Sequence, residues 1–173
     1  AQLRALARAG VLDTANSIAF THSRMPDNYD DRSARLEEFI ASHDALSGDA
    51  ETAVFTLGGL VGRISAFQSY EDVSSTLIRR YPVDYLTKQT IKEVTKEVLQ
   101  MNNSYAEAEE NRSYRTNSRY TDRLADTMLA ADPQSWSLTE AELQWLYSLG
   151  IAYGLSDSTE QSDEEETAEE ATA

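Results

Sequence analysis

The feature that most constrains the fold of this chain is a group of three glycines inside a helical apolar pattern. Between Val54 and Phe67 the apolar residues recur at intervals of three and four, which predicts one helix with an apolar stripe. Gly58, Gly59 and Gly62 lie within it, and each costs roughly 1 kcal/mol relative to alanine in a helix interior. Because glycine lets another backbone approach closely, we expect close packing at these positions.

Two interpretations of this close packing remain open from the residues alone. In the first, neighbouring helices of the same chain cross the glycine-bearing helix tightly. In the second, a partner subunit or a nucleic-acid backbone approaches the glycines from outside. A phosphate-binding loop is not favoured, because the Gly-Gly-Leu-Val-Gly spacing differs from the Walker and dinucleotide fingerprints and no predicted strand precedes it.

The composition predicts one soluble domain. The chain has 173 residues, of which 40% are apolar, enough for a core, and no apolar run approaches the length of a membrane span. The N-terminus resembles the start of an amphipathic helix and shows no signal-peptide core. The absence of cysteine excludes disulfides, thiolate metal sites and thiol nucleophiles. We interpret His22 and His43 as isolated surface or core histidines, because neither has metal-ligand spacing.

The charge is strongly acidic but unevenly distributed. The net charge is −15, and the 15 bases comprise 12 arginines and three lysines. An acidic, lysine-poor surface is expected of a halophilic protein that stays soluble in concentrated salt, although an ordinary acidic cytosolic protein also fits. Residues 56–123 contain ten of the bases and nine acids, a net of +1. An anionic partner is therefore expected to bind this middle region.

The apolar patterns and turn signals predict helices throughout. We expect them over residues 2–23, 31–46, 49–70, 71–80, 87–101, 112–131 and from 139 to about 150. Thr139 and Glu142 form a capping-box pattern at the last of these. No alternating strand pattern occurs. The predicted fold is all-α, a single bundle of six or seven helices over residues 1–155, with a disordered acidic tail over residues 156–173.

Little in the sequence supports catalysis. No nucleophile motif is present, and most acid pairs are expected on solvated helix faces. Carboxylates such as Glu107, Glu109 and Glu110 could form a divalent-metal site, but no apolar pocket pattern surrounds them. We therefore predict a binding or structural protein without enzymatic activity, metal or cofactor.

Two predicted helices carry regularly spaced bases. On the fifth helix the bases are four residues apart: Lys88, Lys92 and Lys96. On the sixth they follow one face over three turns: Arg112, Arg115, Arg119 and Arg123. These bases either pair with neighbouring acids, such as Glu93 and Glu97, or contact phosphates. Arginine suits the second role because its planar fork donates two parallel hydrogen bonds to phosphate oxygens.

Three segments together resemble one known family. They are LGGLVGRISAFQ at 57–68, STLIRRYPVDYLTK at 75–88 and LGIAYG at 149–154. In this order and spacing they resemble the C-terminal part of the large subunit of haloarchaeal type I-B CRISPR effector (Cascade) complexes. The resemblance covers roughly residues 50–155.

The resemblance implies a cytoplasmic, non-catalytic small subunit that acts in antiviral defence. In that family the same reading frame is also translated from an internal start, and the length of this chain fits such a product. Several copies would lie beside the backbone and large subunits. They would bind CRISPR RNA and target DNA, and would stabilise the guide–target hybrid and the displaced strand of the R-loop through backbone contacts.

Site residues follow partly from the resemblance and partly from charge. The matching segments imply backbone contacts by Arg63, Arg79, Arg80 and Lys88. The charge pattern adds Lys92, Lys96 and the four arginines of the sixth helix. Subunit contacts would explain Gly58, Gly59 and Gly62. The alternative function is a helical structural or adaptor protein of a viral or other large assembly, which also fits an acidic, all-helical chain without enzymatic motifs.

Overall fold

The computed structural model describes residues 31–70, 74–107, 117–128 and 131–172. This part of the chain contains no strand. Its α-helices are α2 (Asp31–Ala41), α3 (Asp49–Tyr70), α4 (Leu77–Arg80), α5 (Ile91–Glu107), α6 (Ser118–Met128) and α7 (Glu140–Thr172). Three 3-10 turns connect them: η1 (Asp44–Leu46), η2 (Val83–Tyr85) and η4 (Pro133–Ser135). The predicted all-α class is confirmed; the predicted first helix at residues 2–23 lies outside the described residues.

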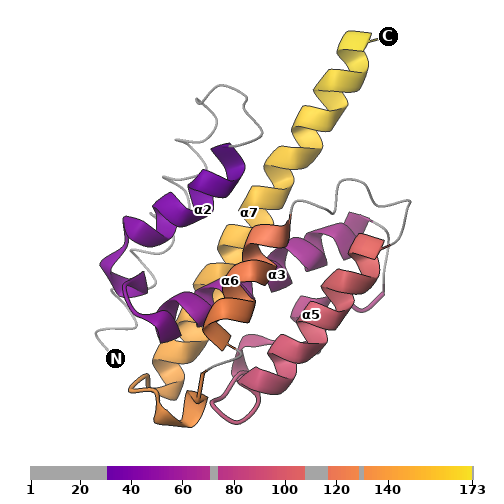
Figure 1. Ribbon diagram of the computed structural model, residues 1–173. Coiled ribbons are helices and arrows are strands. Elements are labelled where there is room, and N and C mark those ends of the chain that lie inside the picture. Colours follow the sequence, from indigo (N-terminus) through magenta and orange to yellow (C-terminus); the bar gives the residue numbers. More distant parts are fainter. Residues whose placement is uncertain (1–30, 71–73, 108–116, 129–130, 173) are drawn as a thin grey trace.

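Helix α3 is the centre of the bundle. It is buried from Thr52 to Ser65, because α7, α6, α5 and α4 all pack against it. Its most extensive partner is α7, which crosses it (Figure 1). Burial of a continuous 14-residue stretch explains why α3 lacks charged residues between Glu51 and Arg63.

The glycines of α3 lie at this crossing. Added Cβ atoms would meet backbone of α7: at Gly58 the Tyr147 carbonyl oxygen lies 2.3 Å away, and at Gly62 the Ile151 carbonyl oxygen lies 2.4 Å away. From the other side, a Cβ at Gly150 would lie 2.1 Å from the Phe55 carbonyl oxygen. The two helices therefore touch backbone to backbone, which only glycine permits.

Gly59 faces α6 instead. A Cβ there would lie 2.6 Å from Cε1 of Tyr120, whose ring fills the space beside the glycine. Neighbouring elements of the same chain thus occupy the faces of Gly58, Gly59 and Gly62. The contacts support the first interpretation, in which helices of one chain cross tightly, and the subunit-packing role assigned to these glycines does not fit them.

An aromatic cluster joins α2 to the central pair. The Phe39 ring of α2 stacks on Phe55 of α3 with centroids 5.2 Å apart and lies 4.7 Å from Tyr153 of α7. His43 also stacks on Phe39, with ring centroids 4.1 Å apart, and its Nδ1 lies 2.6 Å from the Phe39 carbonyl oxygen. His43 is therefore an isolated histidine that covers the edge of the core, as the sequence predicts.

Two helices differ in extent from the prediction. Residues 71–73 of the predicted helix at 71–80 lie outside the described residues, and from residue 74 on it is helical only in α4. Side chains of α3 bind the first amides of α4: Gln68 Oε1 accepts from the Leu77 amide at 2.7 Å, and Ser65 Oγ accepts from the Ile78 amide at 3.0 Å. Helix α5 begins at Ile91, later than predicted, and continues to Glu107, beyond its predicted end at residue 101.

The start of α7 agrees with the sequence, and the helix is longer than the 139–150 segment predicted for it. The capping box is confirmed, since Glu142 Oε2 accepts from the Thr139 amide at 2.8 Å and Thr139 Oγ1 accepts from the Glu142 amide at 3.2 Å. The helix then continues to Thr172, through the segment predicted as a disordered tail from residue 156, and projects beyond the bundle (Figure 1). No glycine or proline follows Gly154 to stop it.

Candidate nucleic-acid interface

Arg63, predicted to contact a nucleic-acid backbone, is instead held inside the fold. It is 9% exposed and pairs through Nη1 with Asp157 of α7. Its Nε donates to Oδ1 of Asn117, and the guanidinium lies 5.6 Å from the centroid of the Tyr120 ring. A buried guanidinium requires such partners. The prediction for Arg63 was wrong because a basic residue in an apolar helix can serve an interior ion pair.

This ion pair belongs to a larger buried network. The Tyr120 hydroxyl donates to Oδ2 of Asp157 at 3.1 Å, and Nδ2 of Asn117 donates to Oδ1 of Asn102 at 3.4 Å. The network connects α3, α5, α6 and α7 around one arginine. Burial and the adjacent Asp157 carboxylate raise the pKa of Tyr120 well above its usual range, so its hydroxyl remains a donor.

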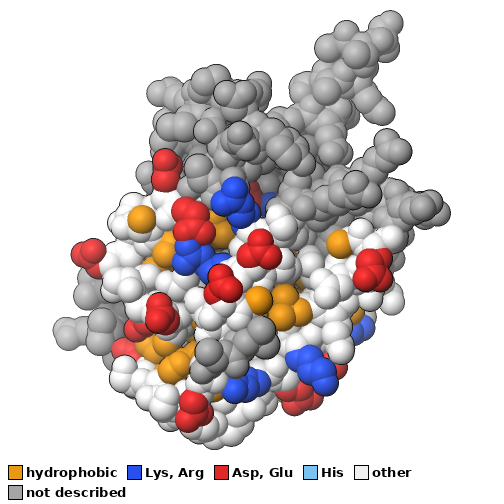
Figure 2. Space-filling view, viewed as in Figure 1, with side chains coloured by type: hydrophobic (Ala, Val, Ile, Leu, Met, Phe, Trp, Pro, Cys, Tyr) orange, Lys and Arg blue, Asp and Glu red, His pale blue; other side chains and the backbone are white. Residues whose placement is uncertain are grey.

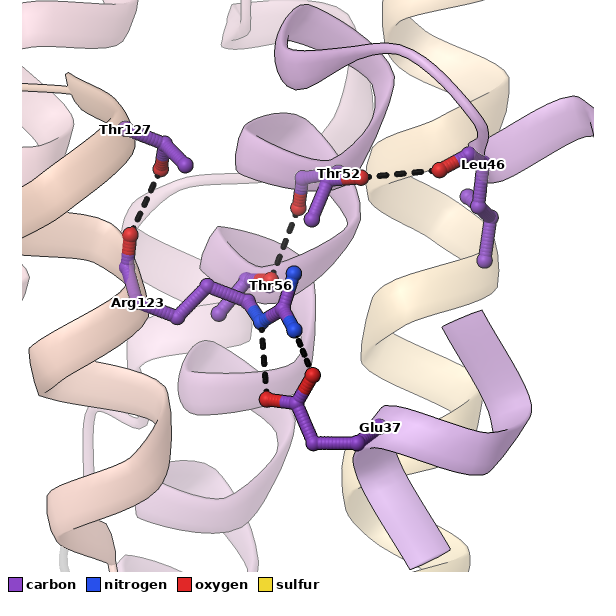
Figure 3. A network of polar contacts seen from close by, with 6 residues as sticks. All are labelled: Glu37, Leu46, Thr52, Thr56, Arg123 and Thr127. Carbon is purple, nitrogen blue, oxygen red and sulfur yellow. Dashed lines mark hydrogen bonds and ion pairs between the residues drawn. The ribbon is translucent and has the colours of Figure 1, made fainter. Parts of the chain in front are cut away.

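The arginine stripe of the predicted sixth helix is only partly available for solvent contacts. Arg112 and Arg115 lie outside the described residues. Arg119 is exposed on α6 and forms no ion pair with any described residue. Arg123, one turn further on, points toward α2 (Figure 3).

Arg123 forms an ion pair with Glu37. Its Nε donates to Oε1 at 3.2 Å and its Nη2 donates to Oε2, so one edge of the guanidinium binds both carboxylate oxygens (Figure 3). Thr127 Oγ1 in turn donates to the Arg123 carbonyl oxygen at 2.7 Å. Partial burial lowers the pKa of Arg123 from its usual value. Because the fork fastens α6 to α2, this geometry does not fit the predicted phosphate contact of Arg123.

The lysine flank of α5 is largely solvent-facing. Lys92 and Lys96 are exposed, and so are Glu93 and Glu97 on the same helix. Lys88 precedes the helix and is half-buried, and its Nζ donates to the Trp136 carbonyl oxygen beside η4. Lys92 and Lys96 therefore remain candidates for phosphate contacts, whereas part of the hydrogen-bonding capacity of Lys88 serves the fold.

Arg79 and Arg80 are the two exposed bases that end α4. Arg79 Nη1 donates weakly to the Ser74 carbonyl oxygen at 3.4 Å, and neither guanidinium forms an ion pair with a described residue. Cations are favoured at this end of a helix by the backbone dipole. With Lys92, Lys96 and Arg119, they make up the exposed bases among the predicted contacts in the described residues.

The face of the molecule in Figure 2 carries no continuous basic patch among the described residues. On the face shown in Figure 2, basic and acidic side chains of the described residues alternate, and several bases lie next to an acid. No group of three or more histidine or acidic residues in the described part of the chain is arranged to hold a metal ion. Of the carboxylates considered for a metal, Glu109 and Glu110 lie outside the described residues. The described residues thus offer exposed bases for phosphate contacts and no metal-holding group of this kind.

Sequence reasoning missed two features of this region. Asp157 was assigned to the tail although it lies three residues after Gly154, on the face of α7 that packs against α3. That helical register was the signal that would have found it. Tyr85, the exposed ring of η2, was also overlooked.

Among the helices of the described residues, none has the length and apolar character that a membrane span requires.

Comparisons with known proteins point to one family. Residues 1–166 match the model for the C-terminal domain of CRISPR-associated protein TM1802. The chain is also 32% identical over 126 residues to a CRISPR-associated protein Cas8b from Haloferax volcanii, an overlap of 71% of this chain. That overlap spans 17% of the length of this curated relative. No solved structure matches the chain.

Proposed function

The chain belongs to the family of the CRISPR-associated protein TM1802 C-terminal domain, and from this premise we propose that it is a non-catalytic small subunit of a type I-B RNA-guided surveillance complex. Several copies would act beside the backbone and large subunits in the cytoplasm. They would stabilise the hybrid between guide RNA and target DNA, and the displaced strand. In such complexes base pairing reads the sequence, and protein contacts to the backbone tip the R-loop equilibrium.

The observation that carries this proposal, together with family membership, is the set of exposed bases that pair with no described acid. Arg79, Arg80, Lys92, Lys96 and Arg119 are all exposed on a rigid helical scaffold. Contacts of this kind bind phosphates independently of sequence. An R-loop subunit needs such contacts, because the guide RNA already supplies the specificity.

The overall acidity of the chain limits what one copy can do. A net charge of −15 opposes binding to a nucleic acid at low salt. In concentrated salt the long-range repulsion is screened, but each phosphate contact is also weakened. We infer that a single copy binds feebly and that neighbouring copies and subunits supply the remaining affinity by raising the effective concentration.

A tagged pull-down of the chain from its native host in high-salt buffer tests the proposal. Mass spectrometry and RNA sequencing of the eluate should find CRISPR RNA together with backbone and large subunits. Recovery of the chain with capsid-type proteins and without RNA would favour the alternative, a helical adaptor of a viral or other large assembly. Metal-dependent nuclease activity of the purified chain would contradict the non-catalytic assignment.

A further inference from the structure

The corner between α4 and α5 presents an exposed aromatic ring that follows two exposed arginines in the chain. Tyr85 of η2 is 41% exposed, and Leu155 is the only other large apolar side chain of comparable exposure in the described residues. The Tyr81 ring lies 5.8 Å from the Tyr85 ring, centroid to centroid. The charge of Arg80 acts on the Tyr81 hydroxyl. Arg79 and Arg80 end the helix that leads directly into this corner.

The backbone of this corner is fixed by side-chain hydrogen bonds, two of them from α7. Three carbonyl oxygens in it accept side-chain hydrogen bonds: that of Tyr81 from the Tyr147 hydroxyl at 2.9 Å, that of Tyr85 from Thr90 Oγ1 at 2.8 Å, and that of Leu86 from Gln144 Nε2 at 3.3 Å. Leu77 and Leu86, each 1% exposed, anchor its two ends. The exposed ring is thus held on a rigid support, which lowers the entropy lost on binding.

The charge around the corner is more favourable to an anion than the chain as a whole. Residues 74–100 contain five bases and three acids, a net of +2 in a chain of net −15. The acids are Asp84, Glu93 and Glu97, and the last two act on the Tyr81 hydroxyl. Because Arg79 and Arg80 form no ion pair with described acids, their guanidinium groups remain available to an external anion.

We propose that this corner binds single-stranded nucleic acid, with one base stacked on the Tyr85 ring and the adjoining phosphates contacted by Arg79 and Arg80. Stacking on an aromatic ring accepts every base, since each base has a π-face. The proposal rests on the proposed function and deepens it. A base inside a duplex cannot stack on a side chain, so this surface selects the displaced strand over the paired hybrid.

Fluorescence anisotropy of the full chain with labelled oligothymidine and with an abasic oligonucleotide of equal length tests the stacking. We expect the wild-type chain to bind oligothymidine about tenfold more tightly than the abasic strand. Tyr85→Ala should lower oligothymidine affinity to the abasic level and leave abasic binding unchanged. Tyr85→Trp should restore the difference. Arg79→Gln with Arg80→Gln should weaken the binding of both strands equally, because phosphates are common to both.

The outcomes separate failure of the stacking from failure of the proposed function. Equal wild-type affinity for the two strands, with the arginine variant weakened, would overturn the stacking and leave the phosphate contacts intact. No wild-type binding to either strand, alone or within the assembled complex, would count against the proposed function itself. If Tyr85→Ala keeps full oligothymidine affinity but loses its protein partners in a pull-down, the corner is a protein-docking surface and the inference is wrong.

Discussion

At the crossing of α3 and α7 backbone lies against backbone, whereas at the corner formed by α4, η2 and the start of α5 charged side chains extend into solvent. The crossing holds five of the seven glycines of the chain within one buried contact. The corner holds Arg79, Arg80 and Tyr85, all exposed. The first region admits almost no substitution without repacking, while the second leaves its side chains free to serve a partner.

The two regions also differ in how clearly they can be predicted from the sequence. A glycine in a helix interior carries a cost that close packing must offset, so the glycine cluster at 58–62 by itself predicts a crossing. A charge carries no comparable signal. In sequence, Arg63 and Arg123 resemble Arg79, yet Arg63 is buried with Asp157 and Arg123 is paired with Glu37. Local pattern therefore predicts packing better than it predicts the partner of a charge.

Breaking the crossing should have the largest effect. Gly58→Ala places a methyl group 2.3 Å from the Tyr147 carbonyl oxygen, which is backbone and cannot rotate away. We expect a loss of about 3 kcal/mol or more in the free energy of unfolding, measured by urea denaturation followed by circular dichroism. Gly48→Ala is the matched control, because its Cβ meets only the flexible end of Glu51, and should change stability by about 0.5 kcal/mol or less. Equal stability of the two variants would show that α3 and α7 can move apart to accommodate the added methyl group.

Removing the buried ion pair beside the crossing should be the next largest effect. Arg63→Ala leaves the Asp157 carboxylate, 17% exposed, without its guanidinium partner, and should cost about 2–4 kcal/mol. Arg123→Ala breaks an ion pair whose Glu37 side chain is 46% exposed, and should cost about 1 kcal/mol or less. Thermal unfolding of both variants gives the comparison. Similar losses would mean that burial does not distinguish the two arginines.

How well the sequence predicted each feature depends on how far apart along the chain the interacting residues lie. The capping box of α7 and the apolar stripe between Val54 and Phe67 depend on neighbours within one or two turns, and the structure confirms them. The shortening of α4 and the burial of Arg63 depend on residues far along the chain, such as Gln68 for the first and Asp157 for the second. The fold determines which of these distant residues meet, so no local sequence pattern indicates them.

The ionisation of tyrosines should sharpen the comparison at alkaline pH. Burial raises the pKa of Tyr120 and Tyr147 above the ordinary value of 10.0. In the unfolded chain tyrosines ionise from about pH 10, whereas these two remain protonated in the folded state. Their contribution to the free energy of unfolding is therefore complete below about pH 10 and is lost as the pH rises above it. Near pH 11 we expect a loss of about 1.4 kcal/mol for each of the two.

Denaturant titrations at pH 8 and pH 11 measure this loss. Tyr120→Phe should reduce the difference between the two pH values, because its ring can no longer ionise in the unfolded state. Tyr85→Phe serves as the control at the corner, because it removes an exposed hydroxyl and leaves the buried tyrosines in place. An equal pH dependence of the wild-type chain and Tyr120→Phe would contradict the buried environment of Tyr120.

Changing the exposed arginines should have the smallest effect on folding and a clear effect on binding. Arg79→Gln with Arg80→Gln removes two charges that pair with no described acid, so we expect stability to change by about 0.5 kcal/mol or less. If both contact phosphates, the slope of log affinity against log salt for target-DNA capture by the reconstituted complex should fall by about 2. The control is Ala45→Glu with Ser47→Glu, which lowers the net charge by the same amount as the arginine variant but at exposed positions beside the opposite end of α3. If this control alters the slope as much, net charge governs DNA binding and the corner does not. If the slope is unchanged in both variants, Arg79 and Arg80 are not part of the interface.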